Sequence, residues 1–497
     1  MRHGLIGALI LAATPALAQD GEVVTKQYED GGVYEGTFQN GRQHGEGTYR
    51  LPNGYEYTGE WVEGEIRGEG VARFPDGSVY EGEFLSGKPH GQGRITFPDG
   101  STYEGDWLAG VIEGEGVATY PDGSRYEGSF RNAQRHGQGT LTAESGYSYE
   151  GEWVYGEKSG QGTITYADGS VYSGTLAEGL RDGTGQLETP DGLIYDGEWD
   201  AGEITGEGTL TLANGDIYTG DFVAGLRQGT GRVAYANGDA YEGDFSGDLR
   251  EGTGTFTRTS GYSYTGDWVA GRIEGQGTAT YPDGAVYAGQ FRDDLPEGQG
   301  TITYPDGTIY EGGWEDGVIS GEGTATYPNG AIYEGQFVDA ARSGRGTLTL
   351  PDGTVYEGQF EAGERQGEGT ATYPDGTVYE GEFADDQRHG QGRITFPDGT
   401  SYEGEFTEGR IEGEGVATYP GGDVYRGQFV DGRREGEGTL TYASGEEESG
   451  TWVAGALTAE TEAEPAAEVD APPADGEAPA AEVEEPAAEV EAPTEEG

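Results

Sequence analysis

Aromatic and polar residues alternate along the chain in a unit of fixed length. Between Tyr80 and Phe84 an aromatic residue or a glycine occupies every second position, and glutamates lie between them. Neighbouring residues of a strand point to opposite faces of a sheet, so this alternation predicts a strand with one aromatic face and one acidic face. A return strand is predicted over 91–97, where glycine and apolar residues alternate with polar ones.

A loop over Leu85–His90, with Gly87 inside it, is predicted to join the two strands into a hairpin. The hairpin lets large side chains cover bare glycines, an arrangement that supports strands rich in glycine. The predicted register has three facing pairs: Phe84 with Gly91, Gly82 with Gly93, and Tyr80 with Ile95.

The same unit fills most of the chain. Its opening tyrosine recurs every 23 residues from Tyr34 to Tyr425, eighteen times without an insertion, and a degenerate nineteenth copy runs from Glu448 to Trp452. Such a period indicates an array in which each unit packs on its neighbours, and we therefore count one elongated domain. Pro-Asp-Gly turns such as Pro98–Gly100 link the hairpins into a meander. At about 4.8 Å per strand the array would extend roughly 170 Å.

The combination of Tyr-Glu-Gly, a second aromatic, a loop glycine, Gly-x-Gly and an Asp-Gly turn resembles the MORN (membrane occupation and recognition nexus) repeat family. The resemblance covers Tyr34 to about Trp452. It implies an all-β fold, an elongated single-layer antiparallel meander of tandem β-hairpins. One copy has Leu176 for the second aromatic, and five lack the loop glycine, which leaves their loop geometry open: Ala133, Asp248, Asp294, Ala340 and Asp386.

A second pattern, with a period of two repeats, is superimposed on the 23-residue unit. Tryptophan replaces phenylalanine at Trp61, Trp107, Trp153 and Trp199, every 46 residues, and isoleucine usually follows in the next loop. Alternate loops carry basic residues and histidine, as in Lys88–His90. Duplication of a two-repeat unit explains this pattern.

The two ends of the chain differ from the array. Met1 to Ala18 has an apolar run and a small-x-small site, which predicts a secretory signal peptide cut before Gln19 and a periplasmic or secreted location. Residues 19–33 form a lead-in and residues 34–455 the array. From Ala456 to Gly497 acidic residues, alanine and proline predominate, so a disordered acidic tail is expected.

The net charge of −64 opposes binding to nucleic acid and makes direct binding to anionic membranes an unfavourable hypothesis. The chain has no cysteine and hence no disulfide. His44, His90 and His136 recur two repeats apart, roughly 19 Å by strand spacing, too far to share one metal ion. The many carboxylates lead us to expect weak calcium binding at most. We find no catalytic or nucleotide-binding motif, and expect no enzyme and no cofactor.

The aromatic face has no second layer in the sequence to cover it, and it is the predicted interaction surface. The candidate residues are Tyr80, Phe84, Phe97, Tyr103, Trp107, Tyr120, Tyr126 and Phe130. The favoured function is a non-enzymatic extracytoplasmic scaffold that binds a protein partner or a second copy as a homodimer. The alternatives are a lipid chain in the aromatic groove, as the family name suggests, and a glycan stacked on the aromatic ladder.

Overall fold

The computed structural model describes residues 21–458, and the fold over this range is built from strands alone. The all-β antiparallel meander predicted from the sequence is confirmed. No helix in this range is long and apolar enough to cross a membrane. The contacts divide the chain into two units, one up to Gly229 and one from Thr230, where the sequence suggested a single domain.

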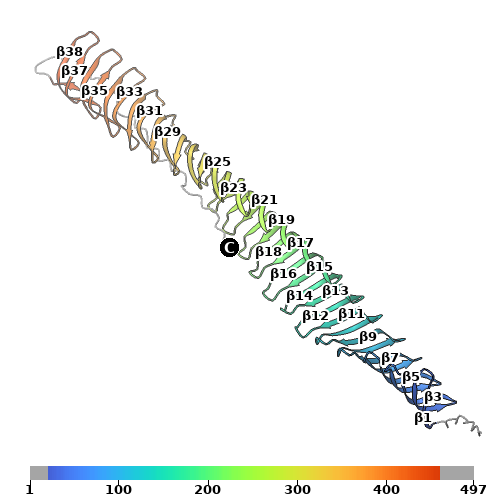
Figure 1. Cartoon of the computed structure of the whole chain (residues 1–497). Helices are drawn as coiled ribbons and strands as arrows, with labels where there is room; N and C mark the ends of the chain where they lie inside the picture. The colour runs from blue at the N-terminus through green and yellow to red at the C-terminus, as the bar shows by residue number, and fades with distance from the viewer. Residues whose placement is uncertain (1–20, 459–497) are drawn as a thin grey trace, which may run out of the picture. The chain divides into compact units, whose positions relative to one another are not determined.

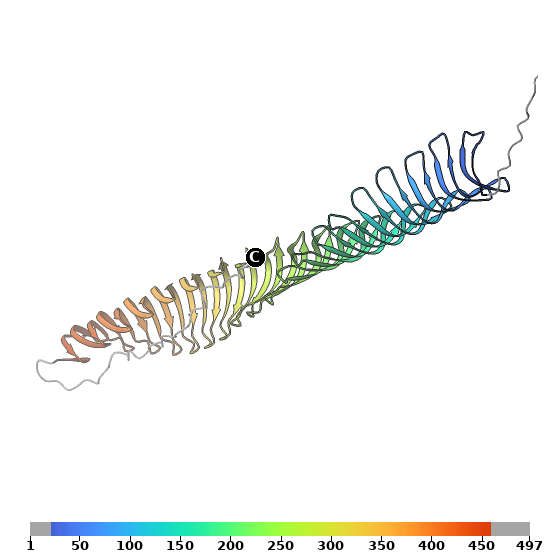
Figure 2. The same ribbon diagram turned by 90° about the horizontal axis from the view of Figure 1, so that it is seen from below.

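In the first unit each strand pairs antiparallel with the next in sequence, and the strands lie side by side in chain order (Figure 1). Figure 2 shows that the hairpins nearest the N-terminus are curved, not flat. The strands of this unit are β1 Val23–Gln27, β2 Val33–Gln39, β3 Arg42–Arg50, β4 Glu56–Val62, β5 Glu65–Arg73, β6 Val79–Leu85, β7 Lys88–Thr96, β8 Thr102–Leu108, β9 Val111–Thr119, β10 Arg125–Arg131, β11 Gln134–Thr142, β12 Ser148–Val154, β13 Glu157–Thr165, β14 Val171–Ala177, β15 Leu180–Glu188, β16 Ile194–Asp200, β17 Glu203–Thr211 and β18 Ile217–Val223.

The division between the units falls inside β19 Leu226–Ala234. The second unit repeats the same antiparallel meander. Its strands are β20 Ala240–Ser246, β21 Leu249–Thr257, β22 Ser263–Val269, β23 Arg272–Thr280, β24 Val286–Arg292, β25 Leu295–Thr303, β26 Ile309–Glu315, β27 Val318–Thr326, β28 Ile332–Val338, β29 Ala341–Thr349, β30 Val355–Glu361, β31 Glu364–Thr372, β32 Val378–Ala384, β33 Gln387–Thr395, β34 Ser401–Thr407, β35 Arg410–Thr418, β36 Val424–Val430, β37 Arg433–Thr441, β38 Glu447–Val453 and β39 Ala456–Leu457.

The hairpin register agrees with two of the three predicted pairs. Tyr80 faces Ile95 and Gly82 faces Gly93, but Phe84 faces Pro89 instead of Gly91. The reason is a β-bulge, a register shift between Gly82 and Phe84, where three residues of β7 lie opposite Glu83, two more than in a regular ladder. Gly91, freed from the hairpin, faces Trp107 of the next repeat.

The predicted six-residue loop over Leu85–His90 is wrong, because the strands run on to a two-residue turn. Ser86 and Gly87 form this turn with φ of 51° and 78°. Two positive φ values give the turn a twist that matches the flanking strands. The five repeats without a glycine here keep the same backbone, with φ from 61° at Ala340 to 72° at Asp248, so the loop geometry left open by the sequence is the common one.

The tyrosine that opens each repeat lies flat over the facing glycine pair. A Cβ added to Gly93 would lie 2.1 Å from the hydroxyl oxygen of Tyr80. That hydroxyl donates a hydrogen bond to the carbonyl oxygen of Glu83 at 2.9 Å, next to the bulge. The glycines are therefore required by contact, since no larger residue leaves room for the tyrosine ring.

The second aromatic of each repeat joins neighbouring repeats. The ring of Tyr80 packs edge to face on Phe84 of its own repeat and on Trp107 of the next, both with centroids 5.0 Å apart. The same contacts recur in the second unit, for example between Tyr379 and Phe406 at 5.0 Å. Inside each unit the core is thus a line of interlocking rings.

The array continues slightly beyond its predicted end at residue 455. Leu457 of β39 faces Trp452 of β38, in the register of a hairpin that has just turned. The rest of the predicted acidic tail, and the predicted signal peptide, lie outside the described residues.

Candidate interaction surface

The structure places most of the predicted interaction residues in the core. The buried ones are Tyr80, Phe84, Tyr103, Trp107, Tyr126 and Phe130, each at most 7% exposed. Phe97 and Tyr120 are half-buried. The six buried rings form one continuous line of edge-to-face contacts, since Tyr103 packs on Phe130 at 4.9 Å and so joins its repeat to the one that begins at Tyr126. A binding role for this face stays a prediction, with Phe97 and Tyr120 its accessible members.

Burial changes the acidity of the tyrosines. Loss of water contact raises the pKa of Tyr34, Tyr149, Tyr172, Tyr195, Tyr241, Tyr356 and Tyr425 to about 12. A phenolate in this line would be poorly solvated, and its hydroxyl could no longer donate to the carbonyl that it caps. The tyrosine line is therefore a neutral structural element at physiological pH.

Many of the carboxylates that give the chain its charge bind backbone N–H groups of the array. Asp106, in the bulge of β8, accepts a hydrogen bond from the N–H of Glu115 at 2.8 Å, and Asp244 and Asp267 bind Thr253 and Gln276 in the same way. Glu113 accepts from the N–H of Asn132, in the turn of the next repeat, at 2.9 Å. These two rows of acids stabilise the bulge and the turn.

The aspartates of the Pro-Asp-Gly turns have a third structural role. Asp99 accepts hydrogen bonds from the N–H and the hydroxyl of Ser101, at 2.9 and 2.6 Å. The hydroxyl bond, followed by the backbone bond, holds the pKa of Asp99 below its usual value, and Asp76 and Asp122 are held in the same way by Ser78 and Ser124. These acids are thus committed to the turns.

A fourth row of acids has no such partner and lines a groove on the polar face of the second unit. The groove has a volume of about 1390 Å³, and its floor is formed by the facing glycines. One wall contains the residue that follows each repeat tyrosine: Glu311, Glu334, Glu357, Glu380 and Glu403. Within residues 21–458 the structure gives these five carboxylates no hydrogen bond or ion pair. We call this feature the polar groove.

Other side chains of the polar groove come from the return strands. They are Gln299, Glu322, Arg345, Glu368 and Gln391 along one line, and Thr324, Thr347, Thr370 and Arg393 along another. Arg393 faces both Glu380 and Glu403 across the strands. Seven glutamates against two arginines leave the polar groove with an excess of five negative charges, from 7 − 2 in the residues that line it. A smaller groove of about 680 Å³ follows it toward β38.

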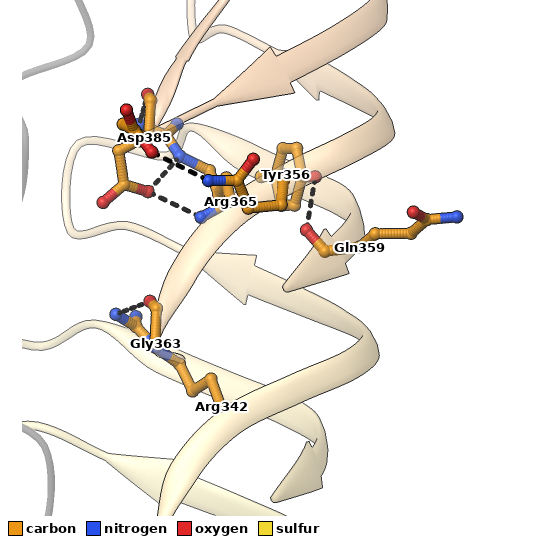
Figure 3. Close-up of polar contacts among 8 residues, drawn as sticks. Arg342, Tyr356, Gln359, Gly363, Arg365 and Asp385 are labelled. Atoms are coloured by element: carbon orange, nitrogen blue, oxygen red, sulfur yellow. Dashed lines mark hydrogen bonds and ion pairs between the residues drawn. The ribbon is translucent and has the colours of Figure 1, made fainter. Parts of the chain in front are cut away.

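Arginines on the opposite face of the second unit are buried among the aromatic rings. Arg342 is 6% exposed, lies with its guanidinium 5.6 Å from the Phe360 ring, and donates to the carbonyl oxygen of Gly363 at 2.6 Å (Figure 3). Arg365 binds the carboxylate of Asp386 at 2.9 Å and its carbonyl oxygen at 2.5 Å. These cations join consecutive repeats and do not face the polar groove.

The described residues hold no cluster of three or more histidines or carboxylates that could bind a metal ion. The sequence singled out the glutamate ladder as the outer acidic face. The sequence did not indicate the polar groove between the side chains of the outgoing and return strands. The depth of the polar groove depends on which side chains bind backbone N–H groups, and the sequence pattern does not contain this information.

The repeat geometry agrees with a family comparison. The MORN repeat family matches the chain over residues 34–54, 57–79, 80–102, 103–125, 126–146, 149–171, 172–194, 195–217, 218–240, 241–261, 264–286, 287–309, 310–332, 333–355, 356–378, 379–401, 402–424 and 425–447. The chain belongs to the MORN repeat family. The eighteen repeats expected from the spacing of the tyrosines are the eighteen that match.

Comparisons with individual proteins add little. A stretch of 50 residues is 46% identical to Alsin of Rattus norvegicus. This stretch covers 9% of this chain and 3% of the length of Alsin. The SAS-4 (dCPAP) TCP domain of Drosophila melanogaster, solved with a proline-rich motif of Ana2, is 19% identical with a TM-score of 0.18, over 36% of this chain and 89% of that one. The TCP10 domain of Danio rerio CPAP is 15% identical with a TM-score of 0.13, over 54% of this chain and 99% of that one.

Proposed function

We propose that this MORN repeat protein is a non-enzymatic extracytoplasmic scaffold, and that its polar groove binds a basic segment of a protein partner. The observation that carries the proposal is the ladder of five glutamates without partners along one groove, where other acids of the array bind backbone N–H groups. Opposite charge steers association and selects the partner.

The extracytoplasmic part of the proposal rests on the leader-like segment from Met1 to Ala18. Fractionation of the producing cells, followed by N-terminal sequencing of the purified chain, tests it. A mature N-terminus at Gln19 in the extracytoplasmic fraction supports the proposal, whereas an intact Met1 in the cytoplasm contradicts it.

The groove is tested with a ten-residue oligolysine peptide as the probe. The groove variant replaces Glu334, Glu357 and Glu380 with Gln. The matched control replaces Glu315, Glu361 and Glu446, three exposed glutamates of the same unit that do not line the polar groove. Both variants lose three negative charges, so the difference between them reports position and not net charge.

We expect the affinity for oligolysine to fall about tenfold in the groove variant and less than about twofold in the control at physiological salt. Equal losses would mean that the peptide senses only overall charge, and would contradict the groove. Binding of the wild-type chain to neutral lipid vesicles or to soluble polysaccharide, unaffected by salt, would favour the aromatic alternatives instead. The predicted weak calcium binding is tested by repeating the peptide titration with a chelator. If calcium binds the glutamates of the polar groove, its removal should raise the affinity for the peptide.

A further inference from the structure

The two outermost long strands of the array each have an open edge. β1 pairs with β2 through one edge, and within residues 21–458 no strand covers its other edge. β38 pairs with β37, and β39 together with Thr458 covers Thr451 to Val453, so that among residues 21–458 no strand covers the other edge from Glu447 to Gly450. An open edge presents unpaired backbone groups and is a template for another strand.

The two open strands are complementary halves of one repeat. In a complete repeat the return strand pairs Gly93 with Gly105 of the next repeat. β1 pairs Val24 with Gly36 in the same register, so it is a return strand whose outgoing strand is not among the described residues. β38 is an outgoing strand whose return strand stops at Leu457.

We propose that β38 of one copy of the chain pairs with β1 of a second copy, head to tail, so that the two strands complete a hairpin repeat across the interface. The register of complete repeats, in which Tyr80 faces Ile95 and Gly82 faces Gly93, fixes the pairs. They are Glu447 with Gln27, Glu448 with Lys26, Ser449 with Thr25, and Gly450 with Val24.

Departures from the repeat at the two ends compensate one another. A complete repeat has a tyrosine that covers two facing glycines. The last copy has Glu448 in place of the tyrosine, and β1 has Val24 in place of the return-strand glycine. A tyrosine together with a valine would collide there, whereas Val24 beside Gly450 occupies the space that the missing ring leaves.

Charge gives the pairing a direction. Glu448 and Lys26 are both exposed and would face each other. The carboxylate of Glu448 accepts a bond from the Tyr442 hydroxyl at 2.8 Å, and the Lys26 ammonium lies 4.9 Å from the Tyr28 ring, so both groups are held at the edges. Two identical ends would bring like charges together, which is unfavourable across paired strands.

The proposed pair of Ser449 with Thr25 would extend a row of facing hydroxyl groups in the sheet. Ser449 already hydrogen-bonds Thr439 of β37 at 2.8 Å, and Thr25 would meet it from the other side. Leu457 lies over Gly450, with its Cδ1 3.1 Å from where a Cβ would be, and has to turn onto Val24 when the second copy joins. In the single copy this side chain lies over Gly450 and leaves the backbone edge from Glu447 to Gly450 without a paired strand among the described residues.

An interface between two different ends of the same chain does not close on itself in pairs, and it adds copies in a row. Four residue pairs make a small interface, so assembly should depend strongly on concentration. None of the residues that pair across this interface lines the polar groove, so either interaction can be lost without the other.

The first test is light scattering of the full chain from about 1 µM to about 200 µM, with charge variants. We expect the mean mass to rise with concentration for the wild type. Lys26→Glu should weaken association at least tenfold, Glu448→Lys should do the same, and the double exchange Lys26→Glu/Glu448→Lys should restore it. Lys88→Glu, a charge reversal on an exposed residue away from both edges, should have no effect.

The second test uses the absence of cysteine from the chain. Thr25→Cys mixed with Ser449→Cys should give a disulfide-linked dimer of the two variants under mild oxidation, and the double variant should give longer chains. Mixing Thr25→Cys with Thr439→Cys, whose residue faces the paired side of β38, should give at least tenfold less cross-linking. A wild type that is monomeric at every concentration, or association unaffected by the charge variants, would overturn the proposal, and circular dichroism verifies that each variant is folded.

Discussion

Repeats of the first unit and repeats between Tyr333 and Phe429 in the second unit cover the same aromatic position in different ways. In the first unit tryptophan alternates with phenylalanine, and the indole N–H of Trp107 donates to the carbonyl oxygen of Gly93 at 3.1 Å. Ile112 faces that indole across the hairpin. In the second region phenylalanine occupies every copy, and mainly arginines lie beside it, with their guanidinium groups 5.6 Å from Phe360 and 5.7 Å from Phe406.

The same backbone accommodates two kinds of side-chain contact at the joint between repeats, where the second aromatic of one repeat packs on the tyrosine of the preceding one. The joint at Trp107 contains an indole hydrogen bond, and at Trp153 and Trp199 the half-buried guanidinium groups of Arg135 and Arg181 also lie 4.2 and 3.9 Å from the indole rings. The Phe–Arg joints of the second region bury the cation more deeply, and it binds a carbonyl oxygen of the next repeat, as Arg388 binds Gly409 at 2.7 Å. Both leave the tyrosine line unchanged, since Tyr103 and Tyr379 are at most 1% exposed. The alternation of tryptophan and phenylalanine along the sequence thus changes the contacts between repeats and leaves the backbone unchanged.

Alkaline pH should have the largest effect, because it acts on the tyrosines that both regions share. Burial raises the pKa of tyrosines such as Tyr195 in the first unit and Tyr356 in the second from 10.0 to about 12. The unfolded chain then loses protons first, so stability is intact below about pH 10 and falls as the pH rises toward about 12. Denaturant titrations from pH 8 to pH 12 measure it. A midpoint that does not change over this range would contradict the neutral tyrosine core.

Enlarging a covered glycine should be the most damaging single change and should not distinguish the regions. Gly93→Val and Gly415→Val each force a side chain into the tyrosine ring, because a Cβ would lie 2.1 Å from Tyr80 and 2.3 Å from Tyr402. We expect a cost of about 3 kcal/mol in either unit, seen as faster hydrogen exchange in the altered repeat. Gly421→Ala, where a Cβ meets nothing within 4 Å, is the control and should stay within about 0.5 kcal/mol.

Removing an arginine should destabilise a repeat of the second region more than a repeat of the first unit. Arg365→Leu leaves the carboxylate and carbonyl oxygen of Asp386 without their donor at a site where the arginine is 6% exposed, and should cost about 2 to 3 kcal/mol. Arg135→Leu, in the first unit, loses one bond of 3.2 Å from a half-buried side chain and should cost about 1 kcal/mol. Hydrogen exchange of the following repeat compares the two. Equal losses would show that burial of the cation does not set the strength of the joint.

Replacing a tryptophan should affect the first unit through its hydrogen bond. Trp107→Phe removes the donor to Gly93 while keeping an aromatic ring, and we expect a loss of about 1 kcal/mol. Trp153→Phe is the parallel case, with its bond of 3.0 Å to Gly139. Exchange rates in the second unit serve as the internal control. No change in either altered repeat would mean that the indole bond adds nothing to the ring contact.

The turn should show a small effect of opposite sign. Ala133 has a φ of 62° where most copies have glycine, so Ala133→Gly should stabilise its repeat by about 1 kcal/mol. Gly87→Ala is the reciprocal change at a φ of 78° with open space around it, and should destabilise by a similar amount. Both are measured by denaturant unfolding, and a loss of stability in Ala133→Gly would contradict backbone strain at this turn.

The sequence by itself determined the period, the family, the all-β fold and the inner and outer face of each strand, because alternation at a period of two leaves no other arrangement for the aromatic residues. It also determined that Gly82 faces Gly93. Only the tertiary structure decided the bulge after Gly82 and the two-residue turn at Ser86, since a register shift of two residues depends on hydrogen bonds that the pattern does not contain. Burial was also decided there: the rings of successive repeats cover one another, so six of the eight residues predicted for binding lie in the core, and Phe97 and Tyr120 are half-buried.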